Sequence, residues 1–400
     1  MKDENRTGSN MGNDGMTLGT APSAGAHETW LDVVRFVAMF FVVVSHAGDT
    51  FNMNAPAGDT YFELMGHIWG SLARFCVPVF AMMTGYLLLP VRQDWGPFVK
   101  KRVGRVTGPF LFWSVIYCLL PFFVGFFGGD LQTLKNVVPF TDATACDGAM
   151  ALTYLKRIPL SFCMMTTHLW YVYMLIGLYL VLPVFSPWYA RTTVRERRAF
   201  VALWICSLML PYLRVWMKDG WVLGECAWND CGLLYPFAGF LGYAVLGSVL
   251  GRMKALSWGK TLALALPLFA AGYVVTFLGY HHVMQVTGGD YEHHANEIEL
   301  YWQFLSPNVA AMSAAVFLLG KKATHVPAWL ATALKDINIC GFGIYCVHYA
   351  IIGLIYHIVL KRLGVPVTIQ LPVLSALAYL TTWGVVHALR KVSIFRGKIV

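Results

Sequence analysis

Residues 30–48 read WLDVVRFVAMFFVVVSHAG, an apolar stretch of membrane-spanning length that also carries Asp32, Arg35 and His46. An ionisable side chain at membrane depth is costly, so three on one span indicate a function. On a helix with about 3.6 residues per turn, Arg35 and His46 lie about 20° apart in azimuth and about 16 Å apart along the axis. Asp32 precedes Arg35 by one turn and shares this stripe. One face of the helix is therefore polar, and we expect it to line a cavity enclosed by protein.

The composition is that of an integral membrane protein. Of 400 residues, 57% are hydrophobic and 13% are charged, whereas soluble domains have about 25% charged residues. The net charge of +9 would indicate nucleic acid as the partner of a soluble protein. Here the location of the basic residues between apolar runs matters more than their sum. We therefore expect the lipid bilayer as a partner, and no nucleic acid.

Ten apolar runs of about 20 residues predict an all-α, polytopic fold with about ten transmembrane helices. The runs cover residues 30–48, 68–90, 106–127, 168–189, 199–217, 232–250, 261–280, 302–320, 337–360 and 367–389. The sequence has no visible internal repeat, which counts against an inverted-repeat transporter. Residues 1–28 are polar, Gly-rich and without a secretory signal, so we expect a disordered cytoplasmic tail there. A membrane domain over 29–390 and a short basic cytoplasmic tail over 391–400 complete the predicted organisation.

The distribution of Lys and Arg predicts the orientation in the membrane. With the N-terminus inside, the inside segments hold 21 of the 30 Lys and Arg residues, and the outside connections hold 7. By the positive-inside rule, both termini are then cytoplasmic. We expect a multi-pass protein of the plasma (inner) membrane. In this orientation Arg35 lies in the inner half of the first span and His46 lies near its outer end.

His46 is the candidate catalytic group of the first span. A neutral histidine can accept a proton near pH 7, and a low-dielectric site strengthens its interactions. Asp32 and Arg35 can pair with each other, which keeps both charges tolerable. That pair belongs either to the catalytic site or only to the packing of the helix.

Arg102 and Arg105 lie in the basic segment 99–105 (VKKRVGR), which connects the second and third spans on the predicted cytoplasmic side. Topology alone explains positive charge at this place. The two residues are nevertheless one helical turn apart and can present two guanidinium groups to one anion. Arginine is the natural partner of phosphate because its fork of N–H groups is planar and bidentate. The segment therefore suits a phosphorylated donor on the cytoplasmic side.

Three further polar residues at membrane depth are candidates for substrate contact: Arg74, His168 and His348. Arg74 falls in the outer part of the second span, His168 at the outer start of the fourth, and His348 near mid-depth of the ninth. His168 is either a member of the interfacial aromatic belt or part of an acceptor pocket. His348 is either a buried hydrogen-bonded group or a functional one. The predicted picture is a polar shaft with its histidines toward the outside.

Two predicted outside connections carry other groups of interest. Residues 287–302 (TGGDYEHHANEIELYW) combine histidines, acids and aromatic residues, but their spacing matches no metal motif, so we predict no metal site. A solvated acidic loop that contacts a sugar is the preferred interpretation, and we assign no role to His281 and His282 beside it. Cys226 and Cys231 can form a disulfide outside the cell, and the sequence leaves this open.

These residues resemble a known family. Residues 31–48, with the pattern Arg-x10-His at Arg35 and His46, look like the first helix of the acyltransferase family 3 membrane proteins. The family's cytoplasmic Arg-x-x-Arg pattern is matched by Arg102 and Arg105. Weaker similarities are VPVFAMMTGYLLL (77–89), HLWYVYMLIGLYLVLP (168–183) and GFGIYCVH (341–348). One departure is Thr-Gly at 84–85, where Ser-Gly is commoner.

The resemblance implies a stand-alone O-acetyltransferase. Such an enzyme moves an acyl group, usually acetyl, from acetyl-CoA or another acyl-CoA to a hydroxyl of a glycan or lipid-linked saccharide. Acyl-CoA is then a co-substrate, and no tightly bound cofactor is expected. His46 would act as base or carry the acyl group itself, Arg102 and Arg105 would hold phosphates of CoA, and Arg35 and Arg74 would stabilise the oxyanion.

Two other classes remain as alternatives at this point. A polysaccharide or lipid exporter would also use a polar shaft through ten spans, but it has no need for a cytoplasmic arginine pair. A structural subunit is disfavoured because the buried charges would serve no purpose. The identity of the acceptor, and acetyl against succinyl as the acyl group, are left open.

Overall fold

The structure is a computed structural model that describes residues 28–56, 58–217, 222–227, 229–393 and 395. The described residues form helices and their connections, and no β-strand occurs among them. The predicted all-α, polytopic fold is confirmed. Nearly all of the tail predicted over 1–28, and most of the one predicted over 391–400, lie outside the described residues.

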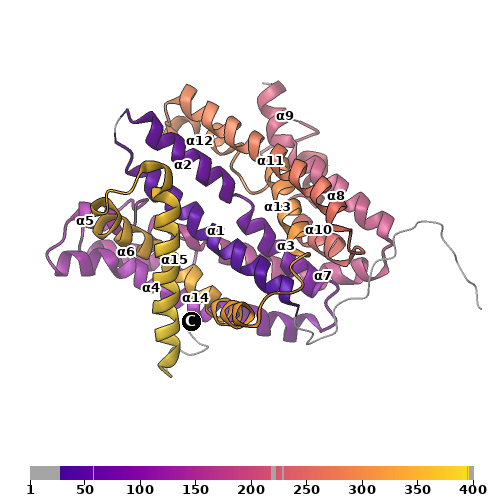
Figure 1. Ribbon diagram of the computed structural model, residues 1–400, viewed down its shortest axis with the longest axis horizontal. Coiled ribbons are helices and arrows are strands. Elements are labelled where there is room, and N and C mark those ends of the chain that lie inside the picture. Colours follow the sequence, from indigo (N-terminus) through magenta and orange to yellow (C-terminus); the bar gives the residue numbers. More distant parts are fainter. Residues whose placement is uncertain (1–27, 57, 218–221, 228, 394, 396–400) are drawn as a thin grey trace, which may run out of the picture.

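Helix α1 (Thr29–Met53) lies at the centre of the molecule (Figure 1). It includes the predicted span 30–48 and continues beyond it. Its main neighbours are α2 (Thr60–Ala73), α3 (Cys76–Leu88), α13 (Pro307–Gly320), α14 (Ala328–Ile358) and α15 (Val367–Lys391). Because these helices surround α1, its polar stripe faces protein rather than lipid.

Eight helices in the described part of the chain are long and apolar enough to cross a membrane. They are Thr29–Met53, Thr60–Leu88, Trp95–Phe126, Met164–Arg191, Val194–Met217, Trp258–Thr287, Ala328–Arg362 and Val367–Lys391. Each overlaps one of the predicted spans. The protein is therefore a multi-pass membrane protein.

The other two predicted spans, 232–250 and 302–320, contain shorter helices. The first divides into the 3₁₀ helix η2 (Gly232–Phe237) and α10 (Leu241–Arg252), which are separated at Gly239 with its φ of 90°. The second yields only the 14 residues of α13, which begins at Pro307. The predicted count of about ten full-length spans is thus not confirmed, because these two apolar runs are interrupted or begin late.

The short helix α10 is held inside the molecule by close packing on α3. A Cβ atom at Gly85 would lie 1.8 Å from the carbonyl oxygen of Ala244, and one at Gly247 would lie 2.1 Å from that of Met82. Glycine is required at both positions because any side chain would collide with the facing backbone. Helix α11 (Trp258–Thr287) packs on α13 over an interface about as extensive as that between α10 and α3.

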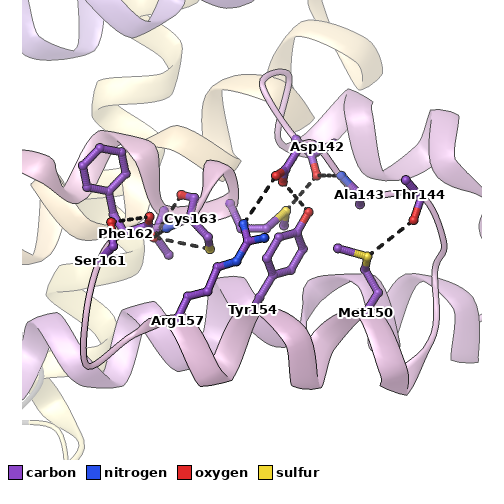
Figure 2. A network of polar contacts seen from close by, with 12 residues as sticks. Asp142, Ala143, Thr144, Met150, Tyr154, Arg157, Ser161, Phe162 and Cys163 are labelled. Carbon is purple, nitrogen blue, oxygen red and sulfur yellow. Dashed lines mark hydrogen bonds and ion pairs between the residues drawn. The ribbon is translucent and has the colours of Figure 1, made fainter.

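A layer of short helices covers one end of α4 (Trp95–Phe126) before the chain enters α7 (Trp170–Arg191). It consists of α5 (Leu131–Val137), α6 (Gly148–Arg157) and the 3₁₀ helix η1 (Met164–Leu169). Figure 2 shows how Asp142 holds the connection between α5 and α6 onto α6. Its carboxylate accepts a hydrogen bond from the Tyr154 hydroxyl at 2.5 Å and pairs with Arg157 at 3.7 Å. This layer positions His168, which lines one of the cavities described below.

The remaining described helices are α8 (Val194–Leu208), α9 (Leu210–Met217), α12 (Tyr291–Glu299) and the 3₁₀ helix η3 (Leu360–Arg362). After α9, the connection is held by an ion pair between Arg214 and the buried carboxylate of Glu225. All nine cysteines lie among the described residues, and all have free thiols. Cys226 and Cys231 are therefore not bridged, and the Glu225 carboxylate instead accepts a hydrogen bond from the Cys231 backbone N–H at 3.0 Å.

Several segments predicted to be cytoplasmic contact one another. The Tyr86 hydroxyl at the end of α3 donates to Glu28 at 3.0 Å, just before α1. Arg252 at the end of α10 donates to the Tyr86 carbonyl at 3.1 Å. Lys321, which follows α13, donates to the Met253 carbonyl at 3.0 Å. This arrangement is the one expected if these segments share one side of the membrane, and the orientation itself stays a prediction.

Candidate active site

Two cavities lie along the polar face of α1. The first has a volume of about 550 Å³ and includes Arg35, Arg105 and Arg390 in its lining; we call it the arginine cavity. The second has a volume of about 720 Å³ and includes His46 and His168; we call it the histidine cavity. The stripe predicted on α1 is thus divided, with Arg35 and His46 in different cavities.

Three guanidinium groups from three helices line the arginine cavity. Arg35 comes from α1, Arg105 from α4 and Arg390 from the end of α15. Arg35 is paired with Asp32 at 3.1 Å, as the sequence predicts. The carbonyl of Asp32 accepts a hydrogen bond at 3.0 Å from Asn338, another residue of the lining. Asp32 therefore orients Arg35 and does not line the cavity itself.

Arg102 takes a different position from Arg105, although both lie on α4. Arg105 lines the cavity, whereas the guanidinium carbon of Arg102 lies 5.9 Å from the centre of the Phe98 ring and is not part of the lining. Arg105 is consequently the stronger candidate for direct contact with a ligand, with Arg102 beside it.

Arg390 lines the arginine cavity and is not among the candidate site residues predicted from the sequence. It donates to the Cys340 sulfur at 3.5 Å. Beside it, the carboxylate of Asp336 accepts hydrogen bonds from Trp383 at 3.0 Å and His387 at 3.1 Å. No local signal separates Arg390 from other basic residues that flank a span, because its partners come from a different helix.

The histidine cavity is built around a cluster of three histidines from separate elements. The ring of His46 on α1 lies 5.1 Å from that of His348 on α14 and 6.4 Å from that of His168 on η1, measured between ring centres. The rings of His168 and His348 are 5.7 Å apart. His46 and His168 line the cavity, whereas His348 is fully buried behind them. Of the three predicted substrate residues, His348 is therefore the one that does not reach the cavity.

Asp49 is the partner of His46, and the sequence analysis missed it. Its carboxylate lies 3.0 Å from Nδ1 of His46, one turn further along α1. A carboxylate only accepts hydrogen bonds, so Nδ1 is the donor and Nε2 is left to accept a proton. The signal was available at the i+3 position, but Asp49 falls just beyond the predicted end of the span.

The other two histidines are held in the same manner by backbone carbonyls. His348 donates through Nδ1 to the carbonyl of Tyr345 at 2.7 Å, and His168 donates through Nε2 to that of Cys346 at 3.3 Å. The second ring nitrogen of each is buried and has no hydrogen-bond partner among the described residues. Each histidine of the cluster therefore has one nitrogen fixed by the protein and one available as an acceptor.

Arg74 lines the histidine cavity from the break between α2 and α3. Pro78 near the start of α3 lacks the N–H that would bond to the Arg74 carbonyl, which favours a break there. The Arg74 side chain donates through Nε to the Trp302 carbonyl at 2.7 Å and lies 4.4 Å from the centre of the Phe304 ring. A second donor contacts the Ser45 hydroxyl at 3.5 Å. Arg74 is thus a fixed positive charge in the cavity of His46.

Aromatic and acidic residues complete the histidine cavity. The lining includes Trp170, Tyr280, Tyr291, Glu299 and Trp302, of which the last three come from the connection predicted to contact a sugar. The two histidines of that connection pair instead with acids nearby in sequence, at 2.8 and 2.9 Å. His281, to which we assigned no role, lies 3.0 Å from the buried His67, measured between Nδ1 atoms.

Two groups of potential metal ligands occur elsewhere in the described chain. One consists of Asp336, Cys340 and His387, and the other of Glu225, Asp230 and Cys231. In each group an arginine contacts a ligand atom: Arg390 the Cys340 sulfur, and Arg214 the two carboxylates. A guanidinium in that position opposes a bound cation by charge repulsion.

The fold and the two cavities describe a multi-pass membrane protein in which a cavity lined by three arginines lies beside a cavity lined by histidines. The chain belongs to acyltransferase family 3, whose sequence profile, described as "Acyltransferase domain", matches residues 28–387. The protein is therefore an acyltransferase, and the resemblance drawn from the sequence is confirmed. No curated protein and no solved structure gave a match.

Proposed function

We propose that this acyltransferase moves an acetyl group from cytoplasmic acetyl-CoA to a hydroxyl of a cell-envelope glycan or lipid-linked saccharide. The observation that carries the proposal is the stripe of α1, which contributes Arg35 to one cavity and the Asp49-paired His46 to the other. One helix thus connects a site for an anionic donor with a site for proton transfer. The enzyme would lie in the plasma membrane with the arginine cavity facing the cytoplasm.

The donor would bind in the arginine cavity. CoA carries several phosphates, and guanidinium groups bind phosphate with paired, charge-assisted hydrogen bonds. Arg105 and Arg390 would bind these phosphates directly, and Arg102 would strengthen the field at the cavity mouth. Arg35, held by Asp32, is the arginine of this cavity that lies on the stripe of α1, and it would contact the pantetheine arm. CoA would be a co-substrate that leaves after each turnover.

The acceptor would bind in the histidine cavity. Tyr280, Trp302 and Trp170 offer flat apolar faces of the kind on which sugar rings can lie, and Glu299 offers a hydrogen-bond acceptor for hydroxyl groups. His168 would border the sugar as part of the cavity wall, because it lines the cavity while its second ring nitrogen is buried. His348 would position His46 from behind rather than touch the sugar.

The reaction would then proceed at His46. Its Nε2 takes the proton of the acceptor hydroxyl while that oxygen bonds to the acyl carbon, and Asp49 stabilises the resulting imidazolium. The carbonyl oxygen gains negative charge, which Arg74 offsets from the same cavity. The carbon–sulfur bond breaks and the proton passes to the CoA sulfur. A route in which His46 first carries the acyl group uses the same residues.

Mass spectrometry of cell-envelope glycans tests the proposal. Cells that carry the protein should contain acetylated saccharide hydroxyls that cells without it lack. Cells that carry the protein with His46→Gln should match the cells without it. Identical glycan acylation in all three would overturn the proposed function.

A further inference from the structure

Four side chains border both cavities: Val42 of α1, Val77 of α3, Tyr171 of α7 and Tyr345 of α14. A residue that lines two neighbouring cavities stands between them, so these four form the partition. Val42, Val77 and Tyr345 are almost fully buried, with exposed fractions of 4%, 8% and 5%. The partition is therefore part of the packed interior.

The two tyrosines form the rigid side of the partition. The Tyr345 hydroxyl donates to the His168 carbonyl at 2.5 Å, which fixes its ring at both ends. The rings of Tyr345 and Tyr171 contact each other edge to face at 5.7 Å between centres. Val42 and Val77 form the other side of the partition. Their branched side chains have few rotamers, so they determine how much space is left beside the two tyrosine rings.

The partition lies on the path that the reaction requires. Val42 is seven residues after Arg35 and four before His46, so all three share one face of α1. Along the axis, Val42 is about 10 Å from Arg35 and about 6 Å from His46. An acyl group whose donor is held in the arginine cavity must pass Val42 before its carbonyl carbon can meet a hydroxyl activated by His46.

The approach to the partition is apolar. On the arginine side it is lined by Met39, Phe80, Leu175 and Phe342, all without charge. A carboxylate carried on the acyl group would lose its hydration there without gaining a partner. A longer hydrocarbon chain would meet the branched side chains of the valines, which cannot shorten or bend away.

We propose that Val42, Val77, Tyr171 and Tyr345 form the acyl-selectivity filter of the enzyme, which passes acetyl in preference to longer or carboxylate-bearing acyl groups. The inference rests on the proposed function, because it concerns the acyl group that this site transfers. It assigns the preference for acetyl to four residues that border both cavities and that belong to neither the arginine set nor the histidine set.

The test compares acyl-CoA substrates of increasing size on purified, reconstituted protein. Release of CoA and acylation of a saccharide acceptor are measured with acetyl-, propionyl-, butyryl- and succinyl-CoA. Wild type should show kcat/KM falling by about tenfold or more per added methylene, the range for a tight apolar pocket. Val77→Ala and Val42→Ala should raise the ratio of butyryl to acetyl transfer by about tenfold, because each removes two methyl groups from the partition. Succinyl transfer should stay low in both variants, because the added space provides no partner for the charge.

A matched control is Val106→Ala. Val106 is a buried valine that lines the arginine cavity without bordering the other one, so its loss should leave the chain-length profile unchanged. Val77→Ile narrows the partition, so it should lower propionyl transfer more than acetyl transfer. This variant keeps the proposal testable if the alanine variants fold poorly. Equal profiles for Val77→Ala and Val106→Ala, or equal use of acetyl and butyryl by wild type, would overturn the filter alone. A folded wild type that transfers no acyl group from any CoA thioester would overturn the proposed function and the filter with it.

Discussion

The two cavities differ in how their charged residues are held. In the arginine cavity, guanidinium groups come from α1, α4 and α15, three helices that are far apart in the sequence, and they converge on one space. At the histidine cavity, each ring of the histidine cluster is tied to a carboxylate or a backbone carbonyl: His46 to Asp49, His168 to Cys346, and His348, buried beside them, to Tyr345. The first arrangement concentrates positive charge, and the second fixes orientation.

This difference indicates a division of labour. Concentrated positive charge binds an anion whatever the exact pose of that anion, so it contributes similarly in the ground state and the transition state. Oriented acceptors contribute when a proton moves, which is in the transition state. Substitutions in the arginine cavity should therefore raise KM for the donor, and substitutions in the histidine cavity should lower kcat.

The largest expected effect belongs to His46. His46→Gln keeps a hydrogen-bonding side chain but cannot accept the proton, and His46→Ala removes both. Each should lower kcat by about 10²-fold or more, the usual contribution of a positioned acid–base group. Steady-state kinetics with acetyl-CoA should show an unchanged KM for the donor, because the guanidinium groups are untouched.

The matched control for His46 is His293→Gln on α12, an exposed histidine with 70% of its side chain accessible. It should retain wild-type kinetics. If His46→Gln transfers acyl groups near the wild-type rate, His46 is a packing residue and the division between the two cavities fails.

The next effect concerns the arginines. Arg105→Ala and Arg390→Ala should each raise KM for acetyl-CoA about tenfold, since a hydrogen bond to a charged group contributes about 1.5–3 kcal/mol. Lysine at either position should restore binding only in part, because it lacks the bidentate fork. Arg102→Ala should have a smaller effect than Arg105→Ala, since Arg102 is not part of the lining.

Arg195→Ala is the control for these variants, because Arg195 is an exposed arginine of a predicted cytoplasmic segment that lines neither cavity. It separates the loss of a specific contact from a general loss of positive charge. An unchanged KM in the combined Arg102, Arg105 alanine variant would remove these residues from the donor site.

A smaller effect is expected at Asp49. Asp49→Ala removes the acceptor of the His46 Nδ1 proton and should lower kcat about tenfold, with KM for acetyl-CoA unchanged. Asp49→Asn should not restore activity, because its amide N–H can donate to Nδ1 and hold the tautomer in which Nε2 carries the proton. Asp94→Ala, at an exposed aspartate outside both cavities, is the matched control. A rise in KM without a change in kcat would show that Asp49 acts on binding rather than on the base.

The sequence predicts those parts of the site that depend on one helix alone. The stripe of Arg35 and His46 and the pairing of Arg35 with Asp32 follow from helical periodicity, and the structure has both. The apolar runs located the spans. Of the two that are shorter than predicted, 232–250 is interrupted at Gly239, which has a positive φ, and the helix in 302–320 begins only at Pro307. Local chemistry is sufficient for these features.

The parts that the sequence does not predict depend on contacts between helices. Arg390 enters the arginine cavity because α15 packs against α14 and α1, and no spacing within α15 indicates this. The convergence of His46, His168 and His348 likewise required three separate elements to meet, although each residue had been singled out. The division of the predicted shaft by a partition depends on four helices at once.

The smallest effect on catalysis is expected at Glu225, which lies outside both cavities. A substitution there tests whether changes in KM and kcat arise only from residues of the two cavities. The hydrogen bonds from Arg214 hold the pKa of the Glu225 carboxyl below its usual range. A carboxyl with a depressed folded pKa stabilises the fold above its unfolded pKa of about 4.3, and this contribution is lost as pH falls through the folded pKa. Glu225→Gln should therefore lower stability at pH 7 by about 1–3 kcal/mol, the cost of leaving Arg214 without its buried partner. The deficit relative to wild type should shrink below about pH 4. Thermal unfolding in detergent across a range of pH measures this difference in stability between wild type and Glu225→Gln. Kinetics on the same samples should show KM and kcat near the wild-type values. A change in KM or kcat under conditions where the variant is fully folded would mean that the connection after α9 takes part in the active site.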